Sequence, residues 1–152
     1  MAQTLFRLPE FLEAPEIFAY CAIRKEVGTK EILQTARKLG KKVALPKITG
    51  TTMEFYYCQH FDELIPNRYG ILEPTTTQLA VAETGLLLLP AVVADVHGYR
   101  IGYGGGYYDR YLAEHPEVFS IMLAFDMQIM EMLPRASFDV PARRVITETN
   151  GF

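Results

Sequence analysis

Short apolar runs alternate along the chain with segments whose apolar residues have helical spacing. Runs of this kind, bounded by turn residues, are typical of buried strands, and they predict strands at residues 17–23, 43–45, 53–58, 86–89, 119–125 and 145–147. Between them, the segment from Thr29 to Gly40 predicts a helix, and the segment from Tyr107 to Glu114 predicts another. Strands that alternate with helices predict an α/β fold: a doubly wound, open and mainly parallel sheet with helices on both faces, three-layered and Rossmann-like.

Proline positions set several of the predicted boundaries. Residues Thr4 to Leu8 are predicted to be the end of a helix that Pro9 stops, and a short connection follows from Leu12 to Pro15. Pro46 is predicted to end the strand that begins at Val43. Connections are also predicted at residues 64–74, and a short helix or turn at residues 128–133.

Composition adds limits to this picture. With 152 residues, 49% of them hydrophobic and 22% charged, the chain is expected to form one globular domain over residues 1–152. A net charge of −3 gives no electrostatic footprint for nucleic acid. We find no signal peptide and no membrane-spanning run, so we expect a cytoplasmic protein without membrane contact, as a monomer or weak dimer. Cys21 and Cys58 are expected to be reduced thiols.

The most unusual stretch runs from Asp95 to Arg110 and reads Asp-Val-His-Gly-Tyr-Arg-Ile-Gly-Tyr-Gly-Gly-Gly-Tyr-Tyr-Asp-Arg. Five of the chain's 11 glycines lie between Gly98 and Gly106. An apolar run precedes the stretch, which therefore predicts a strand, a glycine-rich loop and a helix start. Backbone N–H groups of such a loop can surround an anion, and the helix N-terminus adds positive charge. Glycine is needed there because a Cβ would block both positive φ and close approach to a phosphate.

Side chains in the same stretch could complete a nucleotide site. Arg100 and Arg110 can add positive charge, and Asp109 can hold a divalent cation that bridges phosphates. Flat faces for a ring are offered by Tyr103, Tyr107 and Tyr108. The spacing of the glycines matches neither a P-loop nor the Gly-x-Gly-x-x-Gly pattern.

Each of these features also has a purely structural interpretation. The loop could be a flexible surface loop or a tight turn. The two arginines could pair with Asp95 or Glu114, Asp109 could lie in the first turn of the outgoing helix as a cap, and Tyr108 could pack beneath the loop.

Taken whole, the stretch resembles the nucleotide loop of the 5-formyltetrahydrofolate cyclo-ligases, also called methenyltetrahydrofolate synthetases. Further segments agree with that family in order and spacing: Glu26-Val-Gly-Thr29, Leu45-Pro46-Lys47, Met53-Glu-Phe55, Gly70-Ile-Leu-Glu73-Pro74, Phe138-Asp-Val-Pro141 and Val145-Ile-Thr-Glu148. The resemblance covers nearly the whole chain, roughly from Ala14 to Glu148. Within it, Glu73 could contact solvent, a backbone amide or the substrate.

The resemblance implies an ATP-dependent enzyme that converts 5-formyltetrahydrofolate, with or without a polyglutamate tail, to 5,10-methenyltetrahydrofolate with Mg²⁺. An amide oxygen does not leave when N10 attacks the formyl carbon. Phosphorylation of that oxygen gives an iminium phosphate, from which phosphate departs readily. The protein then has to align the reacting groups and neutralise charge.

The resemblance also implies roles for individual residues. Those implied to contact ATP are Arg100, Gly102, Tyr103, Gly104, Gly105, Gly106, Tyr107 and Tyr108. Those implied to contact the folate are Cys21, Glu26, Met53, Tyr103 and Tyr107, although Cys21 could equally be plain core. Asp109 is implied as the metal ligand, and Arg100 and Tyr107 as the catalytic residues.

The sequence departs from the family pattern at three places. Family members usually begin with a helix that carries a Lys and an Arg, and this chain is expected to lack it. Arg143 stands where some members have an acidic second metal ligand, so either a water replaces that ligand or Arg143 contacts phosphate. Gly105 stands where some members have a Lys.

Two other functions compete with the cyclo-ligase. One is a non-catalytic folate- or nucleotide-binding module derived from the same family by loss of that first helix. The other is a sugar-phosphate isomerase on a similar sheet, which would need a base, with Glu26 and Lys47 as candidates.

Overall fold

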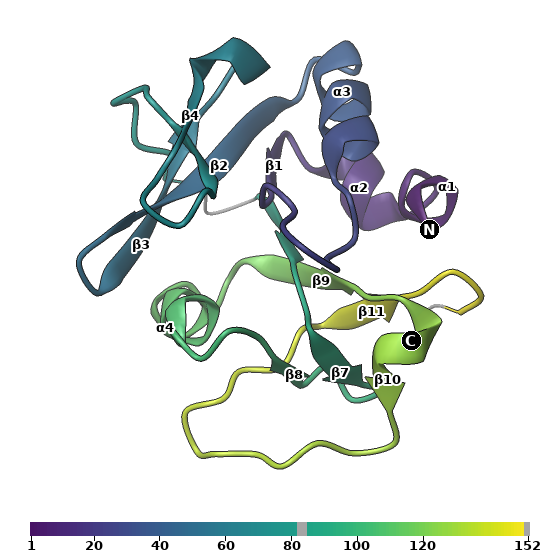
Figure 1. The fold of residues 1–152 in the computed structure, drawn as a ribbon. Coiled ribbons are helices and arrows are strands. Elements are labelled where there is room, and N and C mark those ends of the chain that lie inside the picture. Colours follow the sequence, from purple (N-terminus) through teal and green to yellow (C-terminus); the bar gives the residue numbers. More distant parts are fainter. Residues whose placement is uncertain (82–84, 151–152) are drawn as a thin grey trace.

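A mostly parallel central sheet organises the chain in a computed structural model, which describes residues 1–81 and 85–150 (Figure 1). Six strands of this described part form the sheet in the order β11-β9-β6-β1-β2-β3. Their bounds are Glu16–Phe18 (β1), Lys42–Thr49 (β2), Thr52–Tyr57 (β3), Leu86–Leu89 (β6), Phe119–Leu123 (β9) and Arg144–Ile146 (β11). All neighbouring pairs are parallel except β2 and β3, which form an antiparallel hairpin. The predicted α/β fold with a mainly parallel sheet is thus confirmed.

Helices cover both faces of this sheet, which makes three layers. Three helices, α1 (Ala2–Leu5), α2 (Pro9–Glu13) and α3 (Lys30–Lys38), pack with one set of strand residues in a first apolar core. Helix α4 (Tyr107–Glu114) packs on the other face in a second core. Alternate strand residues point to opposite faces, so Leu86 and Leu88 lie in the first core and Leu87 and Leu89 in the second.

The loop between β1 and α3 is tied back to the end of β1. Thr29 occupies the N-cap position of α3, but its side chain makes no cap hydrogen bond. Its hydroxyl donates instead to the carbonyl of Tyr20 (2.5 Å), while the Tyr20 hydroxyl donates to the carbonyl of Val27 (2.9 Å). The predicted strand 17–23 is therefore too long: β1 ends at Phe18, and the residues after it form this loop.

Two prolines behave differently from the prediction, for identifiable reasons. Helix α1 already ends at Leu5, and Pro9 begins α2 instead of stopping a helix, because a helix's first N–H groups have no partner to lose. Strand β2 continues through Pro46. The Ala44 carbonyl accepts from Ala19 on the β1 side, and Pro46, two residues on, faces that side beyond the end of β1.

Small strands replace three of the predicted connections. Residues 64–74 contain an antiparallel pair, β4 (Leu64–Pro66) and β5 (Leu72–Pro74), preceded by the short 3₁₀ helix η1 (Phe61–Glu63). Residues 126–130 form η2 (Asp126–Gln128) and β10 (Ile129–Met130). The start of the stretch from Asp95 to Arg110 belongs to a hairpin of β7 (Val93–Asp95) and β8 (Arg100–Ile101), so the predicted strand–loop–helix order was wrong in detail.

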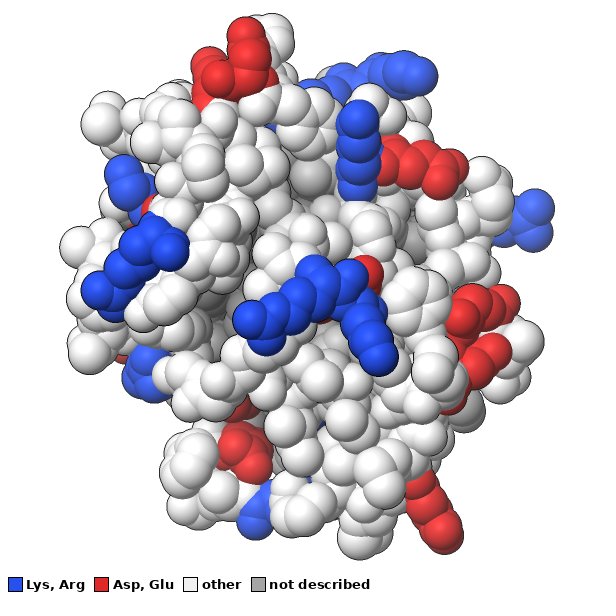
Figure 2. All heavy atoms as spheres, in the orientation of Figure 1, with Lys and Arg blue, Asp and Glu red and all other residues white. Residues whose placement is uncertain are grey.

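Charged side chains of both signs are interspersed on the face shown in Figure 2. No helix within residues 1–81 and 85–150 is long and apolar enough to cross a membrane.

Asp95, at the end of β7, is fully buried and connects the β7–β8 turn to the segment around Leu133. Its carboxylate accepts backbone N–H groups of His97, Tyr99 and Leu133, each at 3.0 Å, and lies 3.5 Å from Arg135. Burial raises the pKa of Asp95, but these N–H groups and the Arg135 guanidinium outweigh it, so the pKa lies below its ordinary value of 3.8. The carboxylate closes the β7–β8 turn and fixes the segment around Leu133.

We expect Asp95→Ala to lower the free energy of unfolding by about 3 kcal/mol near neutral pH, because it leaves buried N–H groups without an acceptor. Urea unfolding followed by circular dichroism measures this. Asp62→Ala, which removes an exposed carboxylate, is the control and should change stability by less than about 0.5 kcal/mol. A lowered folded-state pKa stabilises above the unfolded value, so the difference between parent and Asp95→Ala should shrink as the pH falls through the folded-state pKa. An undiminished difference in acid would contradict this account.

Candidate functional site

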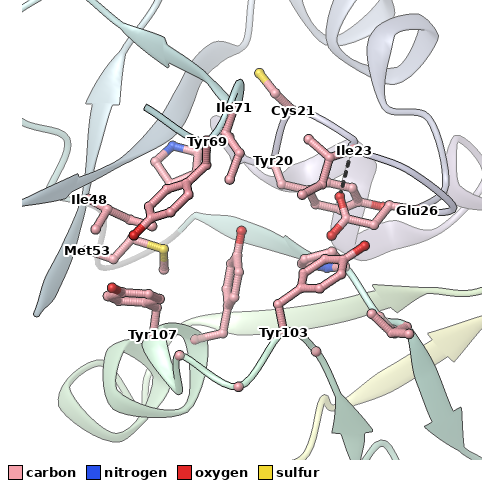
Figure 3. Close-up of a pocket in the computed structure, with 18 of the residues that line it drawn as sticks. Tyr20, Cys21, Ile23, Glu26, Ile48, Met53, Tyr69, Ile71, Tyr103 and Tyr107 are labelled. Carbon is pink, nitrogen blue, oxygen red and sulfur yellow. Dashed lines mark hydrogen bonds between the residues drawn. The ribbon is translucent and has the colours of Figure 1, made fainter. Parts of the chain in front are cut away.

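One pocket of about 730 Å³ opens where the carboxyl ends of β1 and β6 lie side by side. After β1 the chain continues to β2 on one side of the sheet, and after β6 it leads to β9 on the other side. The walls include the loop after β1, the β2–β3 hairpin, the β4–β5 hairpin, the segment after β6, the start of α4 and the glycine loop, which we define as residues 102–106 (Figure 3). Ligand sites of open parallel sheets lie at this kind of position.

The glycine loop presents backbone to the pocket. Gly104 has φ +91° and Gly106 has φ +67°, which L side chains rarely adopt. Space is open around Gly102 and Gly104, where an added Cβ would meet no atom within 4 Å. Gly106 is the N-cap of α4, whose first residues also line the pocket. The loop therefore offers N–H groups and a helix N-terminus to an anion.

Arg100 and Asp109 form an ion pair in the pocket wall. The Arg100 side chain is only 6% exposed; Nη2 lies 3.3 Å from Asp109 Oδ1, and Nη1 donates to the Val140 carbonyl (3.0 Å). Asp109 Oδ1 also accepts the Val140 N–H (3.0 Å). Burial lowers the pKa of Arg100, while the Asp109 carboxylate opposes that shift. Arg100 thus pairs with Asp109 instead of Asp95 or Glu114, and Asp109 accepts from Val140 and does not cap its helix.

The start of α4 is joined to the turn between β2 and β3. Arg110 Nη2 donates to the Thr51 carbonyl (2.9 Å), and its guanidinium lies 5.0 Å from the centroid of the Tyr107 ring. The Tyr107 hydroxyl lies 3.5 Å from the Gly50 carbonyl. The Tyr107 ring also covers Gly105, where an added Cβ would lie 2.5 Å from it. The start of α4, which follows the glycine loop directly, therefore contacts the β2–β3 hairpin at the pocket edge.

Glu26 projects from the loop after β1 and is half-buried in the pocket wall (Figure 3). Its Oε2 accepts the Ile23 N–H at 2.9 Å. Burial raises the pKa of Glu26, and the Ile23 N–H opposes that rise. Tyr20 lines the pocket beside it, and burial together with the Glu26 charge raises the Tyr20 pKa.

The remaining predicted residues also line this pocket. Cys21 is half-buried, and burial, then the neighbouring Cys58, raise the pKa of its thiol to about 11. Met53 is 7% exposed and faces Tyr107 and Ile48 across one side of the pocket (Figure 3). Tyr108 is part of the wall and packs against the second core, and burial raises its pKa. The residues that the resemblance implied to contact ATP, the folate or the metal therefore all line one pocket, whereas Arg110 lies outside its lining.

Sequence reasoning missed part of the lining and misplaced one residue. The missed residues come from the loop after β1, the β2–β3 and β4–β5 hairpins and the segment after β6, and they include Tyr20, Arg24, Ile48, Tyr69, Ile71 and Pro90. The Gly70–Pro74 motif was a signal for two of them, because Tyr69 and Ile71 flank Gly70. Glu73 makes its contacts within the protein: Oε1 accepts from the Ile48 N–H (3.2 Å) and from Asn67 (3.0 Å). Arg143 lies outside the lining and donates to the Pro116 carbonyl (2.8 Å), so it is not placed to contact a phosphate in this pocket.

Carboxylates are sparse at the site. No group of three His, Cys, Asp or Glu residues able to hold a metal occurs within residues 1–81 and 85–150. Asp109, with one oxygen committed to Arg100 and Val140, suits a Mg²⁺ ion that takes a single protein carboxylate and completes its shell with phosphate oxygens and waters.

Comparison with known proteins agrees with this geometry. A family model described as the 5-formyltetrahydrofolate cyclo-ligase family matches residues 1–148. This chain belongs to that family. The resemblance expected from the glycine-rich stretch is thus confirmed, and the chain is a member of a family of enzymes.

Individual relatives support the membership. The chain is 29% identical over 154 aligned residues to the 5-formyltetrahydrofolate cyclo-ligase of Escherichia coli K12, covering 96% of this chain and 85% of the relative. It is 33% identical to a probable cyclo-ligase of Caenorhabditis elegans, covering 91% of this chain and 75% of the relative. The NMR structure of Aquifex aeolicus 5,10-methenyltetrahydrofolate synthetase has a TM-score of 0.85 at 32% identity, covering 99% of this chain and 77% of that one.

We expect the Cys21 thiol to react slowly as a nucleophile in the folded protein. A thiol pKa of about 11 in place of 9.0 lowers the thiolate fraction near neutral pH by roughly 100-fold. Alkylation by iodoacetamide, resolved by mass spectrometry, should be slow at neutral pH and should accelerate toward pH ~11. The same chain in urea is the control, where both thiols should react at ordinary rates. Fast labelling of Cys21 in the folded protein at neutral pH would contradict the prediction.

Proposed function

We propose that this chain catalyses the ATP-dependent conversion of 5-formyltetrahydrofolate to 5,10-methenyltetrahydrofolate, with release of ADP and phosphate. One observation supports it above the others: the glycine loop, Arg100 and Asp109 line the same pocket as Glu26 and Met53. A phosphate-binding surface and an aromatic, partly apolar surface thus face one space. We also infer that the sheet is of the doubly wound, Rossmann-like kind, since strand order reverses between β1 and β6 beside the pocket.

The reaction needs a leaving group that the substrate lacks. The formyl oxygen attacks the γ-phosphorus of ATP, ADP leaves, and the formyl group becomes an iminium phosphate. N10 of the same folate then bonds to the formyl carbon and loses its proton, and the C–O bond breaks with departure of phosphate. The first step is an in-line displacement at phosphorus, and the second is an intramolecular attack within the folate. The enzyme therefore contributes chiefly by orientation and charge stabilisation.

The phosphate end of the pocket supplies that charge stabilisation. Open backbone at Gly102 and Gly104, with the N-terminus of α4 beginning at Gly106, gives donors to phosphate oxygens. Arg100 is held by Asp109 and the Val140 carbonyl, so its guanidinium reaches the phosphates without a large loss of side-chain freedom. Mg²⁺ bound through Asp109 would neutralise phosphate charge.

The other end of the pocket suits the folate rings. Tyr103 and Tyr107 belong to the same segment as the glycine loop and border this end, with Met53 opposite Tyr107 and Glu26 near Tyr103 (Figure 3). Glu26 carries an acceptor that can bind ring N–H groups or the formyl region. Its raised pKa follows from the same burial that excludes water from this wall.

The substrate provides its own nucleophile, so no protein nucleophile is required. The raised pKa of Cys21 agrees with a wall residue. Ser120 is buried on β9 and accepts the Arg143 N–H at 3.3 Å, away from the pocket lining.

We expect Asp109→Ala and Arg100→Ala each to reduce kcat/KM by at least about 100-fold, because each removes a charge-assisted contact to phosphate or metal. Formation of the methenyl product is followed by its absorbance at longer wavelength than that of the substrate. Glu114→Ala, an exposed carboxylate on the same helix, is the matched control and should retain parent activity. Parent protein that binds folate and nucleotide without forming product would favour the binding-module alternative. Absence of both binding and product would refute the folate assignment.

Glu26→Gln should raise KM for 5-formyltetrahydrofolate about 10-fold or more while leaving KM for ATP within about twofold, because Glu26 lies on the folate side of the pocket. Glu31→Gln, on the exposed side of α3, is the control. A rise in the KM for ATP alone would place Glu26 at the wrong end of the pocket.

A further inference from the structure

Arg24 has an unusual backbone conformation at the rim of the pocket. Its φ is +51°, and it is the sole residue other than glycine with a positive φ within residues 1–81 and 85–150. The left-handed region is unfavourable for a side chain such as arginine. Conformations of this kind persist where the surrounding structure fixes them, and they cluster at functional sites.

The guanidinium of Arg24 lies against the glycine loop. It is 5.0 Å from the centroid of the Tyr103 ring, and Tyr103 stands between Gly102 and Gly104 with half of its surface exposed. Arg24 thereby joins the loop after β1 to the loop before α4, across the pocket mouth. A guanidinium that lies over an aromatic ring keeps its N–H groups free to bind an anion at its edge.

Arg24 lacks an acidic partner in the described part of the chain. The ion pairs found there are Lys42–Glu16, Arg100–Asp109, His115–Glu117, Arg135–Asp95 and Arg144–Glu10. The nearest carboxylate along the chain, Glu26, accepts from the Ile23 N–H instead. Figure 2 shows Lys and Arg side chains gathered in the middle of the face, over the segment between β1 and α3. Positive charge at the mouth is therefore available to a ligand.

We propose that Arg24 is an anion-binding residue of this pocket, held over Tyr103 to contact anionic oxygens of a bound substrate. The inference rests on the proposed function, because both substrates carry such oxygens: ATP in its phosphates, and the folate in the carboxylates of its glutamate. Arg24 adds this charge from the loop after β1, whereas Arg100 adds charge from β8. The same contact with Tyr103 ties occupancy of the mouth to the position of the glycine loop.

The test uses Arg24→Asn and Arg24→Lys in the full chain. Asn tolerates the left-handed region, so Arg24→Asn removes the charge without adding backbone strain, and its melting temperature should stay within about 2 °C of the parent. Lys25→Gln is the matched control: it removes the same charge one residue away, from an exposed side chain outside the pocket lining.

We expect Arg24→Asn to raise one KM about 10-fold, the size of one charge-assisted contact at a partly exposed site. A rise in KM for ATP, with weaker calorimetric binding of ADP, assigns the phosphates as the anion. A rise in KM for 5-formyltetrahydrofolate, with ADP binding unchanged, assigns the carboxylates. Arg24→Lys should recover part of the loss, and Lys25→Gln should change both KM values by less than about twofold.

Unchanged KM values and ADP binding in Arg24→Asn, or equal effects of Lys25→Gln, would overturn the inference. A lowered melting temperature with normal KM values would show a purely structural residue. Failure of the proposed function is distinguishable, because it would appear in the parent protein as absence of turnover before any variant is compared.

Discussion

The buried carboxylate of Asp95 is the interaction on which the pocket's geometry depends. It gathers N–H groups from the β7–β8 turn and from Leu133, which is far along the chain. By fixing that turn it determines where β8 begins, and β8 carries Arg100 into the pocket wall. The segment after Leu133 leads to Val140, whose peptide group contacts both Arg100 and Asp109. A buried charge at the end of β7 thus positions the two charged residues of the pocket wall.

The resemblance implies that Arg100 contacts ATP and that Asp109 holds the metal, and the structure brings these two side chains into contact. A cation and an anion in contact have a small combined field, which lowers the cost of keeping both side chains largely buried in the pocket wall. Phosphate and Mg²⁺ would bring the opposite pair of charges to the same place. If both ligands bind together, the ion pair within the protein is replaced by two ion pairs with the ligands. The electrostatic cost of binding would then be low.

Sequence patterns predicted the parts of the fold that hydrophobicity alone determines. The apolar runs at 86–89 and 119–125 became adjacent central strands, and the glycine-rich motif predicted residues that meet in one pocket. The missed features depend on tertiary partners. Pro46 can remain in β2 because β1, the neighbouring strand on that side, has already ended. The β7–β8 hairpin was not predicted, because Gly98 was counted with the glycines of the phosphate loop. The family motif suggested that Arg143 could contact phosphate, whereas its side chain donates a hydrogen bond to the Pro116 carbonyl. The sequence around Arg24 contains no pattern that predicts a left-handed backbone conformation.

The contact between Arg110 and the Thr51 carbonyl has a thermodynamic consequence. It joins the segment proposed for the nucleotide to the hairpin that carries Met53, so the two ligand surfaces cannot relax independently. If one ligand orders this junction, the second ligand finds it already ordered and loses less conformational entropy on binding. The resulting cooperativity would be reciprocal, so that each proposed substrate would raise the affinity for the other by the same factor. A single hydrogen bond at the pocket edge would therefore favour the ternary complex over either binary one, and so limit idle consumption of ATP.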